Sequence, residues 1–259
     1  LRNAFVEKDR IFIAMDLAVH GSLEKRVDAR FAVLGRSTKP CFSEEEIKKY
    51  ALPLLEATAY LHEHYIVHRD IKTPNMLLDA NDNVLLCDFG LATTLDRRGR
   101  CVDGRRVVGS TSYIAPEVAG RRVSDERLDL FSIGVTLYEL AIGYPPVYQN
   151  SKAHLNWVSN LRGADQFLEL ADRTVQLSDE FRELLKILLN PRPGGRKSAR
   201  WLINHVFFNP QGHTNKYVPR QADVNEEVTQ LTRSSRSFDI VGNALKASKS
   251  GESAVRASP

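Results

Sequence analysis

The sequence is poor in cysteine, and the few cysteines it has are not arranged for cross-linking or for metal binding. Its 259 residues include three of them, Cys41, Cys87 and Cys101, with no Cys-x-x-Cys pair. An odd number of widely spaced cysteines excludes a disulfide framework and a zinc knuckle. It favours a reducing intracellular setting, cytoplasmic or nuclear.

Long apolar runs and a strong charge of one sign are also lacking. No apolar run approaches the roughly 18 residues of a membrane span, and no signal peptide is visible. The formal net charge is only +4, which suits an anionic ligand but does not argue for nucleic acid. What remains is ordinary globular composition, 42% hydrophobic and 26% charged, in a chain long enough to bury a sizeable core.

Apolar periodicity predicts a few short strands followed by a mainly helical region. Residues 1–18 indicate a β-hairpin, and "NMLLD" and "NVLLCD" around the turn signal "ANDN" indicate a second one. Ser43 and Glu46 have the spacing of a capping box at the start of a helix. Residues 127–143 predict a buried central helix that ends at a glycine, and residues 178–190 an amphipathic one. From residue 211 the chain is rich in Ser and basic residues, which predicts a disordered tail at 211–259.

The stretch "IVHRDIKTPNMLL", from Ile66 to Leu78, carries an unusual density of charge between apolar flanks. Asp70 is flanked by Arg69 and Lys72, and cations lower the pKa of a carboxyl group, so Asp70 stays ionised at neutral pH. It could accept the proton of a hydroxyl group or orient that group for attack. Lys72 could neutralise charge on a phosphate, and Asn75 offers an amide oxygen to a hard cation.

The tetrapeptide "CDFG" follows the second predicted hairpin and adds a further oxygen ligand. Asp88, at a strand end beside the flexible Gly90, suits direct magnesium ligation. A base, a lysine and two oxygen ligands on neighbouring loops make a set for phosphoryl transfer. Taken alone, Asp-Phe-Gly is a common turn and His-Arg-Asp a surface charge cluster. The order and gaps of "HRDIKTPN", "DFG" and "APE" (Ala115–Glu117) argue against chance.

With these motifs, the chain resembles a eukaryotic protein kinase from Leu1 to about Phe208, and specifically its large C-terminal lobe. The resemblance implies an α+β kinase-like fold, with residues 1–210 forming strands 4–5, the hinge and a mainly α-helical C-lobe. It implies a serine/threonine kinase that uses ATP and Mg²⁺ on protein substrates. Asp70 would be the catalytic base, Lys72 the phosphate contact, and Asn75 and Asp88 the magnesium ligands.

Other positions take family roles by the same resemblance. Ser110 in "GSTSY" stands where the Ser/Thr class keeps a hydroxyl group near the base and the lysine. The nucleotide-facing positions would be the gatekeeper Met15, the backbone of Asp16 and Ala18 in the hinge, Ser22, the adenine floor Leu77, and Cys87. The thiol of Cys87 is a candidate for covalent modification, or simply a small buried apolar group.

The resemblance also assigns residues that organise the lobe. They are His68 and Arg69 of the catalytic loop, Phe89 and Gly90 after the magnesium aspartate, the buried Asp129, and the ion pair between Glu117 and Arg196. The segments "YIAPEV" and "YELAIGYPP" are similar to the AGC group, in which Glu139 would read basic residues upstream of the target hydroxyl. Pro74, however, stands where basophilic relatives often carry a Glu.

Two expected features are missing from the sequence. No Gly-rich loop and no strand lysine for the ATP phosphates occurs, so we expect an N-terminally truncated piece that holds ATP weakly. The alternative is a binding module, either a pseudokinase or a truncated scaffold. In addition, Leu95–Gly109 holds five arginines and no Ser, Thr or Tyr, which predicts that no phosphate in this stretch switches the enzyme on. Asp103 would pair with Arg69 instead, or residues 110–112 would be modified.

Overall fold

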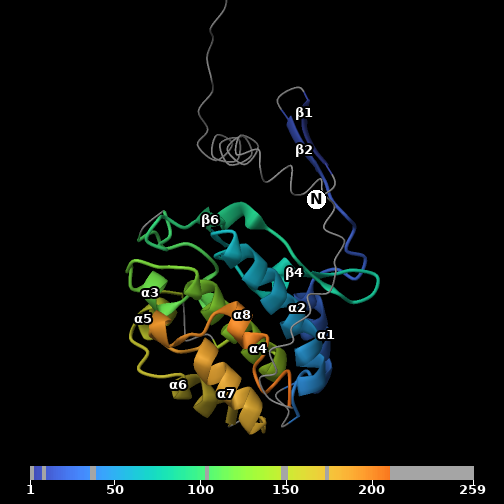
Figure 1. Cartoon of the computed structure of the whole chain (residues 1–259). Coiled ribbons are helices and arrows are strands. Elements are labelled where there is room, and N and C mark those ends of the chain that lie inside the picture. Colours follow the sequence, from blue (N-terminus) through green and yellow to red (C-terminus); the bar gives the residue numbers. More distant parts are fainter. Residues whose placement is uncertain are drawn as a thin grey trace, which may run out of the picture. The chain divides into compact units, whose positions relative to one another are not determined.

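The structure of the chain is a computed structural model that describes residues 3–7, 10–35, 39–102, 105–146, 151–172 and 175–210. The tail predicted at 211–259 lies outside the described residues, and so does Asp103. The described part is an α+β domain, which confirms the predicted fold class. Short strand pairs come first and then recur among a set of helices (Figure 1).

The strands pair only in twos within the described residues, and every pair is antiparallel. Both predicted hairpins are present. In the first, Phe5 lies opposite Phe12 and their rings stack with centroids 5.1 Å apart. The pairs are β1 (Asn3–Glu7) with β2 (Arg10–Ala14), β3 (Ile66–Val67) with β6 (Thr93–Thr94), and β4 (Met76–Leu78) with β5 (Val84–Leu86).

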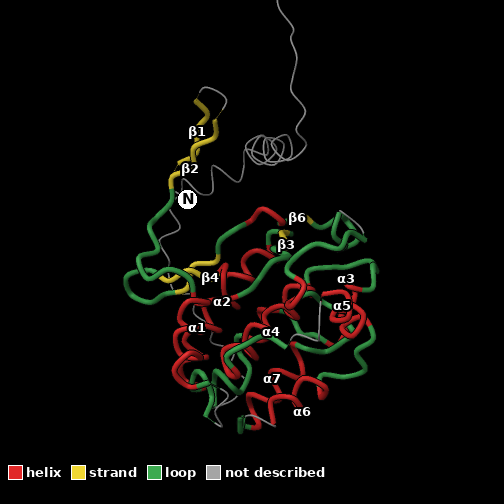
Figure 2. Tube along the Cα trace, turned by 180° about the vertical axis from the view of Figure 1, so that it is seen from behind, coloured by secondary structure: helices red, strands yellow, loops and turns green. Residues whose placement is uncertain are grey.

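Figure 2 shows where the helices lie, and they follow the predicted capping and periodicity where those signals are strong. At the start of α2, Ser43 Oγ accepts the N–H of Glu46 at 3.3 Å, and the Glu46 carboxylate accepts the N–H of Ser43 at 3.0 Å. None of the described helices is both long and apolar enough to cross a bilayer. They are α1 (Leu23–Leu34), α2 (Glu44–Glu63), α3 (Pro116–Ala119), α4 (Arg127–Ile142), α5 (Ser151–Ser159), α6 (Asp165–Asp172), α7 (Asp179–Leu188) and α8 (Ala199–Leu202).

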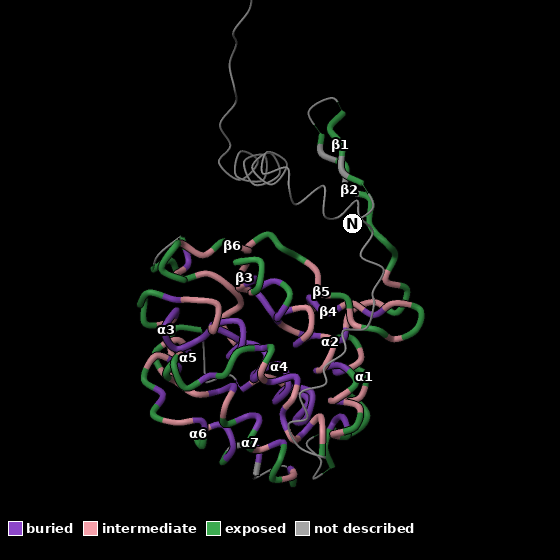
Figure 3. Tube along the Cα trace, in the orientation of Figure 1, coloured by how far each residue is buried: buried purple, intermediate pink, exposed green. Residues whose placement is uncertain are grey.

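Helix α4 forms the centre of the helical core (Figure 3). Every residue from Leu128 to Ile142 is buried, as its nearly all-apolar sequence predicts. It ends at Gly143, which has a left-handed φ of +95° and donates its N–H to the carbonyl oxygen of Glu139 at 2.7 Å. Gly134 lets α7 approach closely, since a Cβ atom there would lie 2.9 Å from the Cβ of Leu188. The site loops are anchored on this helix.

Candidate active site

The loop of residues 68–75 joins β3 to β4, and one carboxylate of α4 holds its first residues. Asp129 is fully buried and accepts hydrogen bonds from the backbone N–H groups of His68, at 2.9 Å, and Arg69, at 2.8 Å. His62 Nε2 lies 3.0 Å from the same carboxylate. Arg69 has a φ of +68°, a left-handed conformation that costs a non-glycine residue about 1 kcal/mol. Asp129 therefore holds a strained backbone in place.

Asp70 is 7% exposed and lies at the centre of a small network of donors. Its Oδ2 atom lies 2.8 Å from Lys72 Nζ and accepts a hydrogen bond from Asn75 Nδ2 at 3.1 Å. Its Oδ1 atom accepts the backbone N–H of Ser110 at 3.0 Å. Burial alone raises the pKa of Asp70, but the hydrogen bonds from Lys72 and Ser110 outweigh burial and hold the pKa below its ordinary value. Asp70 is therefore an ionised carboxylate that can orient a hydroxyl group or accept its proton.

Lys72 and Ser110 meet beside Asp70 although they are far apart in the sequence. Lys72 Nζ lies 2.6 Å from Ser110 Oγ. Gly109 makes this approach possible, and the sequence analysis did not single it out. Its φ is +99°, and a Cβ atom there would lie 2.6 Å from the carbonyl oxygen of Arg69. The signal available in the sequence was the position of this glycine, directly before a loop residue that must reach the base.

The two predicted magnesium ligands lie on adjoining segments. Asn75 Nδ2 donates to the carbonyl oxygen of Asp70 at 2.9 Å, which leaves Oδ1 as the atom for a cation. Asp88 is exposed, and its Oδ1 atom accepts the N–H of Gly90 at 3.1 Å. The N–H of Cys87 donates to the carbonyl oxygen of Asn75 at 3.0 Å and ties the segments together. The described residues contain no group of three or more His, Cys, Asp or Glu that could hold a metal. Two oxygen ligands still suit Mg²⁺, which keeps several of its waters.

His68 connects the catalytic loop to the segment that carries Asp88. Its Nε2 atom lies 3.0 Å from the carbonyl oxygen of Cys87, and its ring meets the ring of Phe89 edge-on at 4.9 Å. Phe89 is itself 45% exposed. Burial, and then the neighbouring Asp88 carboxylate, raise the pKa of the Cys87 thiol. Because a raised pKa leaves less of this thiol in the reactive thiolate form, a packing role is favoured for this cysteine over covalent modification.

The residues expected to face adenine are brought together only in part. Ser22 and Leu77 form an isolated antiparallel bridge. The residue expected at the floor of the adenine site is therefore adjacent to the loop after the hinge. Asp16 is exposed and Ala18 is half-buried. Met15, expected at the back of a pocket, is 67% exposed. The reason is that β1 and β2 pair with no other described strand, so no second wall closes over Met15 within the described residues.

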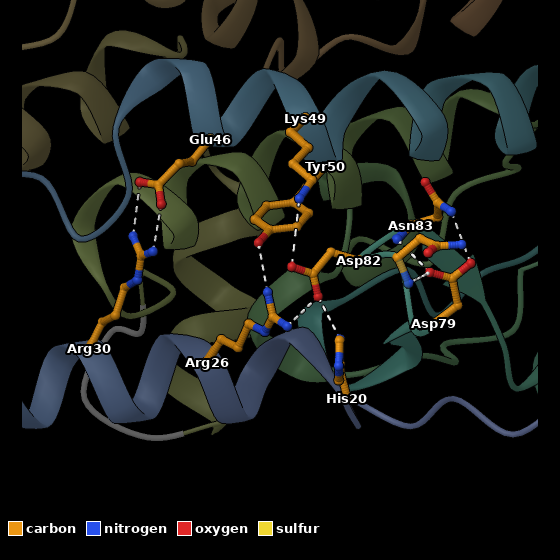
Figure 4. Close-up of polar contacts among 10 residues, drawn as sticks. His20, Arg26, Arg30, Glu46, Lys49, Tyr50, Asp79, Asp82 and Asn83 are labelled. Atoms are coloured by element: carbon orange, nitrogen blue, oxygen red, sulfur yellow. Dashed lines mark hydrogen bonds and ion pairs between the residues drawn. The ribbon is translucent and has the colours of Figure 1, made fainter.

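A network around Asp82 fixes the loop that leads from the hinge into α1 (Figure 4). The Asp82 carboxylate lies 2.6 Å from His20 Nδ1 and 3.6 Å from Lys49 Nζ, and it accepts a hydrogen bond from Arg26. Arg26 first, and then His20, hold the pKa of Asp82 well below its ordinary value. The N–H of His20 also donates to the carbonyl oxygen of Leu78 at 3.2 Å. In the sequence this turn carries only a hairpin signal, and nothing in it indicates the network.

The predicted pair of Glu117 and Arg196 is a buried bidentate ion pair. Arg196 donates to the two carboxylate oxygens of Glu117 at 2.7 and 2.9 Å, and each residue is 2% exposed. The same guanidinium donates to the carbonyl oxygens of Arg127 at 2.9 Å and Asn190 at 2.8 Å. The pair therefore joins α3 to the start of α4 and to the segment after α7.

Glu139, expected at the substrate face, points instead into the lobe. It is 5% exposed, and its carboxylate accepts hydrogen bonds from Tyr113 Oη at 2.7 Å and from Thr73 Oγ1 at 3.1 Å. Burial raises the pKa of Glu139 to about 7, against the two hydrogen bonds and with help from Glu24 and Asp28. The carboxyl group links the catalytic loop to the 3₁₀ turn at residues 111–113 and is not presented at the surface.

Comparisons with known proteins identify the family of the chain. Residues 1–208 match the family described as Protein kinase domain. The chain is 36% identical to the Serine/threonine-protein kinase TIO of Arabidopsis thaliana, over 78% of this chain and 14% of that protein. It is 31% identical to the Serine/threonine-protein kinase PLK4 of Drosophila grimshawi, over 82% and 26% respectively. It is 29% identical to the Calcium/calmodulin-dependent protein kinase type 1 of Caenorhabditis elegans, over 81% and 56%. The chain thus spans between about a seventh and just over half of these relatives.

Proposed function

We propose, from the premise that this chain belongs to the protein kinase domain family, that the protein transfers the γ-phosphoryl group of ATP to a Ser or Thr hydroxyl of a protein substrate. The observation that carries this proposal is the cluster around Asp70. A lysine ammonium group and an amide ligand each lie within hydrogen-bond distance of one buried, ionised carboxylate. Phosphoryl transfer needs this combination, because positioning and charge stabilisation supply most of its catalysis.

Each residue of the cluster has a role that its contacts support. Asp70 orients the acceptor hydroxyl and takes its proton. Lys72, held between Asp70 and Ser110, neutralises charge on the phosphoryl group in transit. Asn75 and Asp88 would hold Mg²⁺, which when bound neutralises charge on the ATP phosphates.

The nucleotide side of the site carries a narrower proposal. The backbone of Asp16 and Ala18 would bind the adenine edge, with Leu77 beneath the ring and Ser22 beside it. The bridge between Ser22 and Leu77 and the network around Asp82 support this, since both fix the loop against β4. Met15 would border the same site, and Cys87 would lie under the nucleotide as a packing residue.

Finer assignments rest on the residues alone. The Lys at position 72 and the hydroxyl of Ser110 favour Ser or Thr over Tyr as the acceptor. The likeness of "YELAIGYPP" to the AGC group supports an AGC-like subtype, and three free cysteines support an intracellular setting, cytoplasmic or nuclear. We propose no preference for basic substrates, because the Glu139 carboxylate is buried and engaged.

Phosphoamino-acid analysis of a protein substrate incubated with γ-labelled ATP and the full-length protein tests the proposal. We expect magnesium-dependent label on Ser or Thr, and at least a tenfold loss in Asp88→Asn, which removes a charged ligand. An exposed carboxylate on α2, altered as Glu45→Gln, serves as the control and should leave transfer unchanged. Label on Tyr alone, or equal transfer by Asp88→Asn, would contradict the proposal. Binding of ATP with no transfer would favour a binding module.

A further inference from the structure

Six arginines form an exposed basic surface beside the active site, and phosphoryl transfer itself does not use them. Four belong to the segment between β6 and α3, and two follow α3 directly. In Figure 1 this segment lies on the same side of the lobe as α3. The basic surface consists of Arg97, Arg98, Arg105, Arg106, Arg121 and Arg122, all of them exposed.

Two acidic groups in this region are already paired within the protein. Asp96 accepts hydrogen bonds from the guanidinium of Arg100 at 3.0 and 3.2 Å, and Asp125 lies 3.3 Å from Arg127. Asp103 lies outside the described residues. Within the described part of the chain, no carboxylate stands at ion-pair distance from the six arginines. The basic surface therefore carries positive charge that the described lobe does not neutralise.

Arg106, the member of the basic surface nearest to Ser110 in the sequence, lies within reach of the acceptor site. Ser110 is fixed to the catalytic loop by its N–H bond to Asp70, and Arg106 precedes it by four residues. At no more than about 3.6 Å per residue, the Cα atoms of Arg106 and Ser110 are within about 14 Å of each other. The turn that carries Arg97 and Arg98 is joined to the segment after α3 by a hydrogen bond of 2.9 Å, which the N–H of Cys101 donates to a backbone carbonyl oxygen of that segment.

Resting on the proposed kinase activity, we propose that the basic surface selects protein substrates with Glu or Asp side chains within about four residues of the phosphorylated Ser or Thr. An extended peptide advances about 3.4 Å per residue, so four residues cover the same 14 Å as the path from the acceptor site to Arg106. Guanidinium groups bind carboxylates with two parallel hydrogen bonds, and they repel Lys and Arg in the wrong substrate.

A peptide fits this surface better than a nucleic acid does. The whole chain carries a net charge of only +4, which is small for a nucleic-acid-binding protein of this length. Arg105 and Arg106 lie five and four residues before Ser110, whose N–H is bonded to the catalytic carboxylate, where a substrate segment must pass. Exposed ion pairs are weak and are screened by salt. We therefore expect the preference for acidic peptides to appear as a lower KM and to decrease as the ionic strength rises.

The test compares peptides that share one central serine and differ only in its flanks: three Glu, three Gln or three Lys on each side. We expect the full-length protein to phosphorylate the Glu peptide with the highest kcat/KM. In the double variant Arg105→Gln/Arg106→Gln, the ratio of kcat/KM for the Glu peptide to kcat/KM for the Gln peptide should fall roughly three- to tenfold, through a change in KM. The matched control, Lys25→Gln/Arg192→Gln, removes the same charge from two exposed residues, one on α1 and one after α7, and should keep that ratio.

Other outcomes separate the two proposals. Equal kcat/KM for the Glu and Gln peptides, or an unchanged ratio in Arg105→Gln/Arg106→Gln, overturns the inference while the kinase activity stands. If no peptide is phosphorylated, the activity proposal fails. Fluorescence anisotropy of labelled peptides then tests the surface by itself, and equal binding of the Glu and Gln peptides overturns it. Tighter binding of a single-stranded RNA that displaces the Glu peptide would assign the surface to nucleic acid and also overturn it.

Discussion

Two buried carboxyl groups, one in the catalytic loop and one bonded to it, have pKa values shifted in opposite directions. Asp70 has Lys72 as an immediate partner, and its pKa lies below the ordinary value. Glu139 has only the neutral donors Tyr113 and Thr73, and its pKa is raised to about 7. The difference follows from the partners, because burial alone raises the pKa of both. One group is a charged acceptor, and the other is close to half-protonated at neutral pH.

Glu139→Gln tests the protonation of the buried carboxyl group. The pKa of Glu139 is about 7 in the folded chain against an ordinary value of 4.5, so the folded state binds the proton more tightly. The resulting stability is present below about pH 4.5 and is lost as the pH rises through about 7. We expect the free energy of unfolding of the unaltered protein, measured in urea, to fall as the pH rises from about 4.5 to about 7. The fall should exceed that of Glu139→Gln by on the order of 3 kcal/mol. Parallel pH profiles for the two proteins would contradict this assignment.

At the scale of elements, the segment before Ser110 depends on the absence of a side chain at position 109. A positive φ and a 2.6 Å approach to the carbonyl oxygen of Arg69 both exclude a Cβ atom at Gly109. This segment delivers the N–H of Ser110 to Asp70 and its hydroxyl to Lys72. A displacement of a few tenths of an ångström here would therefore be felt directly at the base.

Gly109→Ala should lower kcat by at least tenfold, because the new methyl group pushes Ser110 away from Asp70. It should also cost about 1 kcal/mol or more in the free energy of unfolding. Gly194→Ala is the matched control, since nothing lies within 4 Å of the position of its Cβ atom and its φ is not positive. Steady-state kinetics and urea unfolding of both variants decide the matter. Wild-type kcat in Gly109→Ala would show that the contact has no catalytic importance.

Elements with strong local signals could be predicted from the sequence. The capping box at Ser43 and the nearly all-apolar run that ends at Gly143 fix both the type and an end of their helices. The prediction from residues 178–190 also holds, since Phe181, Leu184 and neighbouring leucines of α7 are buried. In each case local chemistry and burial favour the same structure.

The remaining elements depend on contacts that a linear reading does not contain. Helices α3, α5 and α6 are short, so packing against neighbouring elements must supply most of their stability. The network around Asp82 joins residues up to 62 positions apart, and only the folded chain brings them together. The motif residues of the site could be recognised because their order and spacing are specific. The inward direction of Glu139 could not, since the sequence does not indicate which side of α4 faces Tyr113.

At the scale of the whole molecule, the Glu117–Arg196 pair connects parts of the lobe that lie far apart in the sequence. It joins the end of the segment that carries Ser110 to the residues after α7. Four of the five guanidinium N–H groups donate hydrogen bonds to protein oxygens, which take the place of water around the buried charge. Removal of the carboxylate leaves that charge without its counter-ion in the interior.

Glu117→Gln should lower the free energy of unfolding by about 3–5 kcal/mol, because the buried guanidinium loses its counter-ion. The control is Glu63→Gln, which breaks the ion pair of Glu63 with Arg200, whose side chains are 49% and 43% exposed. That change should cost less than about 1 kcal/mol. Urea unfolding at one pH measures both variants. Losses of similar size would mean that the buried pair contributes no more to stability than a surface pair.

The central claim is that Asp70 acts as the base of a phosphoryl transfer. The most direct measurement is kcat for transfer from ATP to a Ser peptide by the full-length protein and by Asp70→Asn, with nucleotide affinity determined for both. Asn keeps the size of the side chain and removes the ionised oxygen. We predict that kcat falls by about 10²- to 10⁴-fold while the affinity for ATP stays within a few-fold. Equal kcat values for the two proteins would contradict the claim.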